Sequence, residues 1–337
     1  MEIKPKIISI FAGCGGSSLG YQMAGYNELL AIDFDKNCEE TFNTNFPNIP
    51  FWCKDITTIT SSRIFEFTGL KLGELDLLDG SPPCQGFSVA GKRKVNDKRN
   101  ILFLEFIRLI RELSPKVFVM ENVLGLSFGE MKGIFNEIMN EFGKLPYKTK
   151  CRMMNAKNYN VPQARKRLIW IGIRKDFGIE PVFPSPTSGN IITAGMAIKD
   201  LEESEKKNRK EITNGLRWYG EKLKLGENAA KYHKKGSLFG LRRIKRDSPC
   251  PTIIKSAGTG LLHYKYSLQF LSIRELARLT SFPDSFEFIG SRGIQIDMIG
   301  NCVPPRMMEA IARIIKEKIL DGLQIEIRLV DKIKKGR

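Results

Sequence analysis

Strand-length apolar runs alternate with helical stretches through the first half of this sequence, and a glycine or a charged residue follows closely after each run. A helical pattern covers residues 101–113 and stops at Ser114–Pro115. Strands that are joined through helices lie parallel, because right-handed crossovers return the chain in the same direction. We therefore predict an α/β fold with a doubly wound, mostly parallel sheet. The apolar runs are 6–11, 29–32, 75–78, 117–120 and 168–173.

The pattern changes near residue 185, where Gly, Ser, Thr and charged residues become frequent. Residues 222–246 hold nine Lys or Arg and one Glu, a net charge of +8 that is too one-sided for an ordinary solvated face. Order returns at Ser272, which forms a capping-box pattern with Glu275, and a last apolar helix follows Pro304–Pro305. We predict a catalytic and cofactor-binding domain over 1–180, a small irregular basic domain over 181–290, a C-terminal return onto the first domain over 291–325, and a basic tail over 326–337.

Composition narrows the class of protein. The 337 residues carry 54 Lys and Arg against 37 Asp and Glu, a net charge of +17 that suits a polyanionic partner. No apolar run approaches the roughly 18 residues of a membrane span, so we expect a cytoplasmic protein without membrane contact. Seven cysteines without a CxxC pair, together with two histidines, predict free thiols and no metal site.

A glycine-rich turn, Phe11–Gly16, follows the first predicted strand and precedes a helical stretch. At the carboxyl edge of a parallel sheet, such a turn lets the backbone approach a cofactor, and the helix N-terminus favours an anionic group. Asp33 follows Gly13 by 20 residues and is suited to a ribose hydroxyl. The dinucleotide pattern GxGxxG fails at Ser18, so S-adenosylmethionine, with a carboxylate and no phosphate, is favoured over NAD. The alternative is a tight turn that serves helix–strand packing.

Cys84 and Glu121 each follow a predicted strand, and one crossover helix separates those strands. Parallel strands end at the same sheet edge, so both side chains should face the cofactor crevice. A thiolate can add to an electrophilic ring carbon while a protonated carboxyl donates to a ring nitrogen. The alternative, a buried packing role, suits the other cysteines, Cys302 included. It does not suit Cys84, whose Pro-Pro-Cys-Gln-Gly loop adjoins the basic residues 92–99 that favour a thiolate.

Taken together, these segments resemble the motifs of the DNA (cytosine-5) methyltransferase family, of the prokaryotic restriction-modification type. They occur in the order that the family shows, and the resemblance runs from residue 7 to about residue 320. The matching segments are Phe11–Gly16 (cofactor loop), Pro82–Gln85 (nucleophile loop), Glu121–Val123 (acid motif), Gln163–Arg167 (QxRxR) and Gly300–Pro304 (GNxVP).

The resemblance implies a mechanism. Cys84 would attack C6 of a cytosine that has left the helix, so that C5 takes a methyl group. Glu121 would hold N3 and the exocyclic amine, and water would remove the C5 proton. Arg165 and Arg167 are two apart on an extended segment and share a face; one would reach the cytosine O2 and the other would support the pocket, and the sequence leaves open which. Their alternative is a solvated strand edge.

The resemblance also carries over the binding residues. Asp33 would bind the ribose, Phe34 would stack on adenine in place of the tryptophan often found there, and Asp55–Ile56 would hold the adenine edge unless they form a simple strand-end turn. The predicted S-adenosylmethionine residues are Phe11, Gly13, Cys14, Gly16, Asp33, Phe34, Asp55, Ile56, Pro83, Leu102, Asn301 and Val303. The predicted substrate residues are Pro82, whose carbonyl would face the cytosine amine, with Gln85, Ser88, Asn122 and Gln163.

The implied partner is double-stranded DNA, held by the target-recognition domain at 181–290. We expect a monomer that acts alongside a restriction endonuclease and protects host DNA, with a frayed basic tail that makes only non-specific DNA contacts. Two alternatives of the same fold are a tRNA cytosine-5 methyltransferase and a catalytically silent DNA-binding relative. The first lacks its Cys-Phe-Thr signature here, and the second gives no reason to keep Cys84, Glu121, Arg165 and Arg167.

Overall fold

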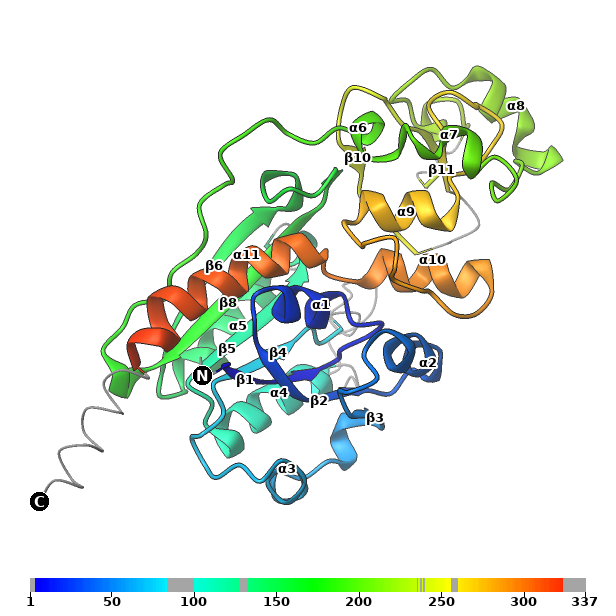
Figure 1. Cartoon of the computed structure of the whole chain (residues 1–337). Coiled ribbons are helices and arrows are strands. Elements are labelled where there is room, and N and C mark those ends of the chain that lie inside the picture. The colour runs from blue at the N-terminus through cyan, green and yellow to red at the C-terminus, as the bar shows by residue number, and fades with distance from the viewer. Residues whose placement is uncertain are drawn as a thin grey trace, which may run out of the picture.

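The computed structural model describes residues 4–83, 100–127, 132–234, 236, 238, 240–255 and 260–323. Its centre is a seven-stranded sheet in the order β3-β2-β1-β4-β5-β8-β6 (Figure 1). Neighbouring strands from β3 to β5 are parallel, whereas β8 is antiparallel to β5 and to β6. The predicted mostly parallel α/β sheet is therefore confirmed. The strands are β1 (Lys6–Ile10), β2 (Asn27–Asp33), β3 (Phe51–Cys53), β4 (Leu77–Gly80), β5 (Val117–Val123), β6 (Tyr147–Asn155) and β8 (Lys166–Arg174).

Strands β3 and β6, and the antiparallel direction of β8, are the features of the sheet that the sequence did not predict. β6 has no apolar run, because it lies at the sheet edge and buries only Tyr147 and Met154 along its length. Between β6 and β8 the chain forms only a 3₁₀ turn, Ala156–Asn158, and the two-residue strand β7 (Gln163–Ala164). Without a crossover helix, two adjacent strands of a sheet run antiparallel.

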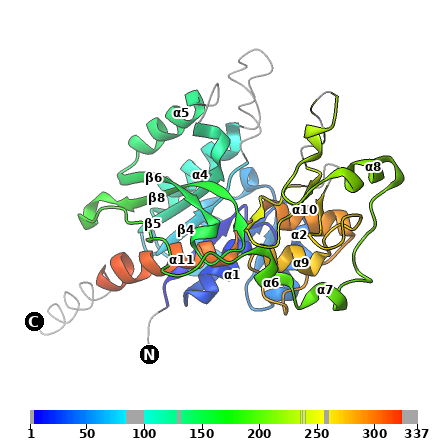
Figure 2. The same ribbon diagram turned by 90° about the horizontal axis from the view of Figure 1, so that it is seen from above.

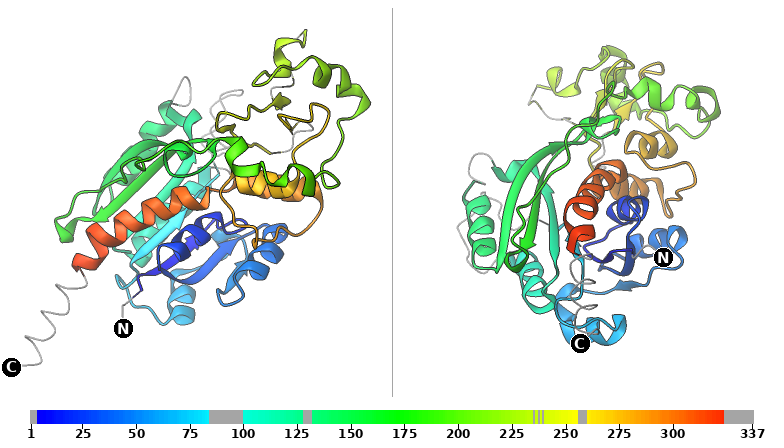
Figure 3. Two further views of the ribbon diagram at one scale, coloured as in Figure 1. Left: turned by 45° about the horizontal axis from the view of Figure 1, so that its top comes forward. Right: turned by 60° about the vertical axis from the view of Figure 1, so that its left-hand side comes forward.

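Helices cover both faces of the sheet (Figure 3). On one face α3, α4 and α5 bury apolar side chains, and Phe106 of α4 meets Phe118 of β5 with ring centroids 6.0 Å apart. On the other face α1 and α11 pack against Val119 and its neighbours. The helices are α1 (Gly16–Met23), α2 (Lys36–Asn45), α3 (Ser61–Thr68), α4 (Asn100–Leu113), α5 (Lys132–Gly143) and α11 (Pro305–Ile315).

Helix α11 packs against α1, beside the sheet. Met307, Met308 and Ile311 are fully buried on its inner face, which lies against α1. The approach is close at Gly20 of α1, where an added Cβ would lie 2.6 Å from the Met308 Cβ and 2.7 Å from the Pro305 carbonyl oxygen. Glycine is needed there because no side chain fits between the two helices.

Residues 181–301 form mostly short elements at one end of the molecule, beside the sheet (Figures 1 and 2). Strand β10 pairs with β7, β11 pairs with β9, and the predicted capping box of Ser272 and Glu275 begins α9. The prediction of irregular structure here is confirmed. The elements are α6 (Ala194–Ile198), α7 (Leu201–Ser204), α8 (Asn214–Lys222), β9 (Arg242–Arg243), β10 (Cys250–Pro251), β11 (Leu261–Leu262), α9 (Ile273–Leu279) and α10 (Arg292–Asn301).

The end of this region shares a core with the first domain. Phe282, Phe286 and Phe288 pack together, and the Phe286 ring lies 6.0 Å from that of Phe46, which follows α2. Burial of aromatic surface on both sides fixes α9 and α10 against α2. In the part of the chain that the structure describes, no helix has the length and apolar character to cross a membrane. The basic tail, 326–337, lies outside the described residues.

Candidate active site

The glycine turn joins β1 to α1 and serves both packing and access. Gly15 has a φ of 93°, and an added Cβ would collide with Phe46. An added Cβ on Gly16 would lie 2.6 Å from the Val303 carbonyl oxygen. The packing alternative therefore holds for these two glycines. Gly13, with a φ of 54°, has no atom within 4 Å of an added Cβ and stays open to a ligand.

Asp33 lies at the end of β2 and fixes the open part of the turn. Its Oδ2 accepts a hydrogen bond of 2.8 Å from the Gly13 backbone N–H, and its Oδ1 accepts one of 2.9 Å from the Asp35 N–H. Burial raises the pKa of the Asp33 carboxyl above its usual value. These two backbone donors orient the Asp33 carboxyl, and the hydrogen bond from Gly13 fixes the glycine turn.

A cavity of about 150 Å³ opens beside this carboxyl. Phe34 exposes 66% of its surface at the cavity rim, so one aromatic face is free for a flat ligand. Sequence reasoning missed Ile32 and Lys54, which also line it and whose types carry no motif. Six predicted cofactor residues line the cavity: Phe11, Asp33, Phe34, Asp55, Ile56 and Leu102.

Asp55 forms the strand-end turn that the sequence left as an alternative. Its Oδ1 accepts hydrogen bonds from the Thr57 backbone N–H at 2.9 Å and from the Thr57 hydroxyl at 2.8 Å, which caps the short 3₁₀ helix Ile56–Thr58. Within the described ranges, the Oδ2 of Asp55 makes no hydrogen bond. The turn therefore leaves one carboxylate oxygen at the cavity wall.

Glu121 and Asn122 lie inside β5, not after it as expected. The strand continues to Val123 because β8 pairs with it residue by residue, Glu121 opposite Ile169. The β4 pairing with β5 ends at Gly80 opposite Met120, so Glu121 lies one residue beyond it. The predicted location at the carboxyl edge of these strands is retained.

The two arginines of the QxRxR segment have different partners. Arg167 Nε lies 2.7 Å from Glu121 Oε1, an ion pair in which the N–H does not point along a hydrogen bond, and both side chains are about nine-tenths buried. Arg165 donates hydrogen bonds to the carbonyls of Ile253, at 3.0 Å, and Gly300, at 2.9 Å. Burial lowers the pKa of Arg165 to about 10. The alternative of a solvated strand edge is wrong.

Asn122 binds the segment that leads to the predicted nucleophile. Its Nδ2 donates a 3.0 Å hydrogen bond to the Pro82 carbonyl, and its Oδ1 accepts one of 2.8 Å from the Val123 N–H. The Pro82 carbonyl, predicted to face a cytosine amine, thus already has a donor inside the protein. Pro83 is exposed. Three predicted residues, Cys84, Gln85 and Ser88, lie outside the described residues.

Gln163, predicted to contact the substrate, binds the segments around Ile253 and Thr280. Its amide is fully buried, and its Oε1 accepts a 3.2 Å hydrogen bond from the Ile253 N–H. Its Nε2 donates to the Thr280 hydroxyl at 3.1 Å and to the Leu279 carbonyl at 3.3 Å. Both amide protons are thereby engaged, so no donor is left for a ligand.

The GNxVP segment lies behind the glycine turn. Val303 is buried against Gly16, whereas Asn301 is exposed at the end of α10, and neither lines the cavity beside Asp33. The Cys302 thiol donates to the Ile299 carbonyl at 3.2 Å, and burial raises its pKa to about 12. Burial also raises the pKa of the Cys14 thiol well above its usual value. Cys14 is buried and Cys302 is half-buried, and both pack in the core beside α2 and α10.

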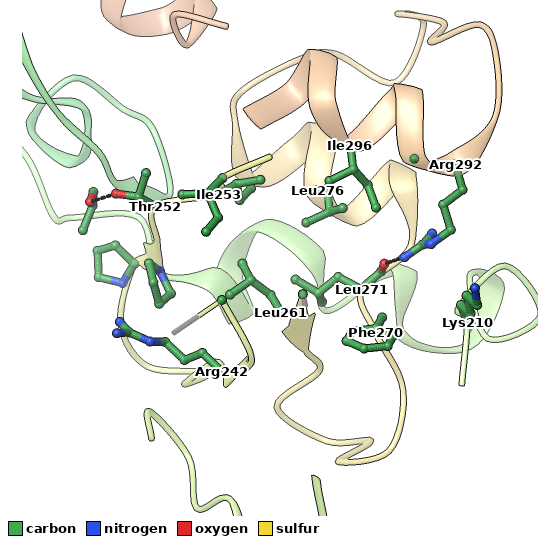
Figure 4. A pocket seen from close by; sticks show the side chains of 17 residues that line it. Lys210, Arg242, Thr252, Ile253, Leu261, Phe270, Leu271, Leu276, Arg292 and Ile296 are labelled. Atoms are coloured by element: carbon green, nitrogen blue, oxygen red, sulfur yellow. Dashed lines mark hydrogen bonds between the residues drawn. The ribbon is translucent and has the colours of Figure 1, made fainter. Parts of the chain in front are cut away.

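A larger cavity, about 710 Å³, lies between residues 240–271 and α10 (Figure 4). Leu261, Leu271 and Ile296 form an apolar floor, and none of the described residues that line the cavity is acidic. Arg292 donates a 2.5 Å hydrogen bond to the Leu271 carbonyl. Arg292 falls outside the basic stretch of the sequence, so sequence reasoning missed it. The cationic residues at this cavity are Lys210, Arg242 and Arg292.

Comparison with known proteins agrees with this geometry. The family model for C-5 cytosine-specific DNA methylase matches residues 5–317. The chain is 34% identical over 325 residues to the Type II methyltransferase M1.HphI of Haemophilus parahaemolyticus, covering 91% of this chain and 86% of the relative. It is 32% identical over 366 residues to the Type II methyltransferase M.DdeI of Desulfomicrobium norvegicum, covering 91% and 87%.

A solved structure, the Dnmt2 methyltransferase of S. pombe, shares the fold with a TM-score of 0.68 at 16% identity, covering 94% of this chain and 99% of that one. The fold is thus that of the S-adenosylmethionine-dependent methyltransferases. The family model spans nearly the whole described chain, from before β1 to just past the end of α11. The protein therefore belongs to the C-5 cytosine-specific DNA methylase family and is a DNA cytosine-5 methyltransferase.

Proposed function

We propose that the protein transfers a methyl group from S-adenosylmethionine to C5 of a cytosine everted from double-stranded DNA, through covalent attack by Cys84 on C6. The observation that carries the proposal is the convergence of three parts at one sheet edge. They are the cavity beside Asp33, the Glu121–Arg167 pair, and the Asn122–Pro82 hydrogen bond at the start of the Cys84 loop.

The residues that would hold the cofactor fit its chemistry. Phe34 offers an exposed aromatic face for adenine, and Asp33 offers a carboxylate for ribose hydroxyls. The open Gly13 leaves backbone room for the methionine part. S-adenosylmethionine, when bound, supplies an electrophilic methyl group on a sulfonium.

In the proposed mechanism, the Cys84 thiolate adds to C6 and makes C5 nucleophilic. Glu121 holds N3 and the exocyclic amine, with its carboxyl oriented by Arg167. Once C5 carries the methyl group, water removes the C5 proton, and the S–C6 bond breaks to restore the thiolate and the aromatic ring. Each bond that Cys84 forms is thereby broken again within one turnover.

The sequence left open which of Arg165 and Arg167 contacts the cytosine O2, and their hydrogen bonds favour one assignment. Arg165 spends its two terminal nitrogens on backbone carbonyls. Arg167 uses Nε for Glu121 and Nη1 for the Lys166 carbonyl, at 2.8 Å. Its Nη2 has no hydrogen-bond partner among the described residues. We therefore assign the cytosine O2 to Arg167 and the support of the pocket from behind to Arg165.

We further propose that residues 181–290 bind DNA. The net charge of +17 favours phosphates, as does the larger cavity, whose described lining residues include cations and no acidic residue. Eversion of the target costs a few kcal/mol of stacking, which the phosphate contacts offset. By analogy with the Type II methyltransferases that it resembles, we propose that it acts as a monomer alongside a restriction endonuclease and protects host DNA.

The test uses tritiated S-adenosylmethionine with duplex DNA or tRNA as acceptor. We expect label in DNA, loss of turnover in Cys84→Ser with cofactor binding retained, and unchanged turnover in the control Cys151→Ser, whose thiol lies on the distant edge strand β6. DNA with 5-fluorocytosine at the target should form a denaturant-resistant adduct, because fluorine does not leave C5 as a cation. Label in tRNA alone, or an active Cys84→Ser, would overturn the proposal.

A further inference from the structure

Two carboxyl groups are buried behind the glycine turn, between α1 and the sheet, and the proposed mechanism does not use them. Asp79 of β4 is 3% exposed, and its Oδ1 accepts a 3.1 Å hydrogen bond from the Tyr21 hydroxyl of α1. Glu28 of β2 is 8% exposed, and its Oε1 accepts a 3.0 Å hydrogen bond from the Ser18 hydroxyl of α1. Both carboxyls thus bind the helix that the glycine turn begins.

The two carboxyls lack a cationic partner in the part of the chain that the structure describes. Within residues 4–83, 100–127 and the later described ranges, neither Asp79 nor Glu28 forms an ion pair with a lysine or arginine. By contrast, Asp76, three residues before Asp79, lies 2.7 Å from the Lys116 Nζ. A buried carboxyl without a cation is neutral until the pH rises well above its ordinary pKa.

Among the groups around Asp79, the carboxyls of Glu28 from β2 and Glu121 from β5 disfavour its charge. The hydrogen bonds from Tyr21 and Ser17 of α1 oppose this effect and lower the pKa of Asp79, but they do not outweigh burial. On α11, which packs against α1, Glu309 is already paired with Arg306 and Arg313. Burial is the main cause that raises the pKa of Asp79 to about 8, and it raises that of Glu28 to about 7.

Asp79 also lies between the strand of the glycine turn and the strand of Glu121. Its backbone pairs with Ser9 of β1 and Val119 of β5, two residues before Glu121. The chain then runs through Gly80 to Pro82, whose carbonyl Asn122 holds. The Tyr21–Asp79 hydrogen bond therefore joins the helix of the proposed cofactor site to the strand that leads to the proposed nucleophile.

We propose that Asp79 is a positioning residue for methyl transfer, which in its protonated form holds the nucleophile strand in register with α1 through Tyr21. The inference rests on the proposed function. When Asp79 loses its proton, the new buried charge is repelled by the carboxyls of Glu28 and Glu121, and no lysine or arginine among the described residues pairs with it. Repulsion there loosens the α1–β4 contact, so the cofactor and the nucleophile lose their alignment.

The experiment measures single-turnover methyl transfer from pH 6.5 to 9.5 with bound DNA and saturating cofactor. The rate of the unmodified protein should fall by about fivefold between pH 8 and pH 9, as one group with a pKa of about 8 loses its proton. Asp79→Asn keeps the acceptor for Tyr21 but has no proton to lose. It should match the unmodified protein at pH 7 within about twofold and show no alkaline fall. The control Asp76→Asn should retain the fall.

Two further variants separate positioning from folding. Tyr21→Phe and Asp79→Leu remove the hydrogen bond and should lower the rate at pH 7 by about tenfold, while the Kd for DNA stays unchanged. If Asp79→Leu does not fold, Tyr21→Phe decides the matter. An alkaline fall in Asp79→Asn equal to that of the unmodified protein, or a normal rate in Tyr21→Phe, would refute the inference. Failure of the unmodified protein to methylate DNA at pH 7 would instead refute the proposed function.

Discussion

Replacement of Arg165 by alanine tests whether one buried cation holds the sheet to the segment around Ile253 and to the GNxVP segment. The side chain is 1% exposed and donates to the carbonyls of Ile253 and Gly300. Two hydrogen bonds from a charged donor contribute about 3–6 kcal/mol in total. Against this, the pKa lowered to about 10 reports that burial of the cation costs about 3 kcal/mol.

The variant loses more than the difference between these terms, because it leaves two buried carbonyls without a donor and a cavity where the side chain was. We expect Arg165→Ala to lower the free energy of unfolding by about 2–4 kcal/mol. Arg165→Lys should lower the free energy of unfolding by about half as much, because its ammonium group can bind one of the two carbonyls but not both. The exposed neighbour Lys166 supplies the control, and Lys166→Ala should change stability by less than about 0.5 kcal/mol.

Urea denaturation followed by tryptophan fluorescence measures these differences, with the same denaturant dependence required in all variants. Hydrogen exchange adds a local readout, because the amides around Ile253 and Gly300 should exchange faster in Arg165→Ala than in Lys166→Ala. A stability of Arg165→Ala within about 0.5 kcal/mol of the unmodified protein would show that water replaces the guanidinium without loss. The bracing role assigned to Arg165 would then be wrong.

Three further predictions concern the cofactor side. Burial raises the pKa of Glu28 from 4.5 to about 7, so the folded state keeps a proton that the unfolded state releases. The free energy of unfolding should therefore fall by up to about 3 kcal/mol as the pH rises from 4.5 to 7. Thermal unfolding scans of Glu28→Gln should not show this loss. Phe34→Ala should weaken S-adenosylmethionine binding about tenfold by calorimetry, and Phe34→Trp should preserve it. Gly16→Ala should cost about 1–3 kcal/mol because its Cβ meets the Val303 carbonyl, whereas Gly133→Ala, with nothing within 4 Å, should not destabilise.

Much of the cofactor side could be predicted from the sequence because each of its residues follows a strand or a turn with a local signature. The glycine turn, Asp33 and the Asp55 turn all lie at ends of parallel strands, where the topology alone directs them to one edge. The start of helix α9 could also be predicted from a local pattern, because a capping box needs only Ser272 and Glu275. Local patterns are enough where the site uses consecutive strand ends.

The polar residues of the motifs were harder to interpret, because their partners lie far along the chain. The family resemblance predicts substrate contacts for Asn122 and Gln163, yet Asn122 binds a carbonyl 40 residues away and Gln163 binds a backbone amide 90 residues away. A side-chain amide suits a base edge and a backbone group equally well. Only the fold decides between them. Strand β6 was missed for a related reason, since an edge strand that buries two side chains has no apolar signature.

One short segment, formed by β7 and the start of β8, connects several distant parts of the chain. Gln163 binds the Thr280 hydroxyl, Arg165 binds the carbonyls of Ile253 and Gly300, and Arg167 pairs with Glu121. These contacts are buried, so a shift of the proposed DNA-binding region, residues 181–290, must move the segment or break its hydrogen bonds. The segment therefore links the proposed DNA-binding region directly to the proposed catalytic carboxyl.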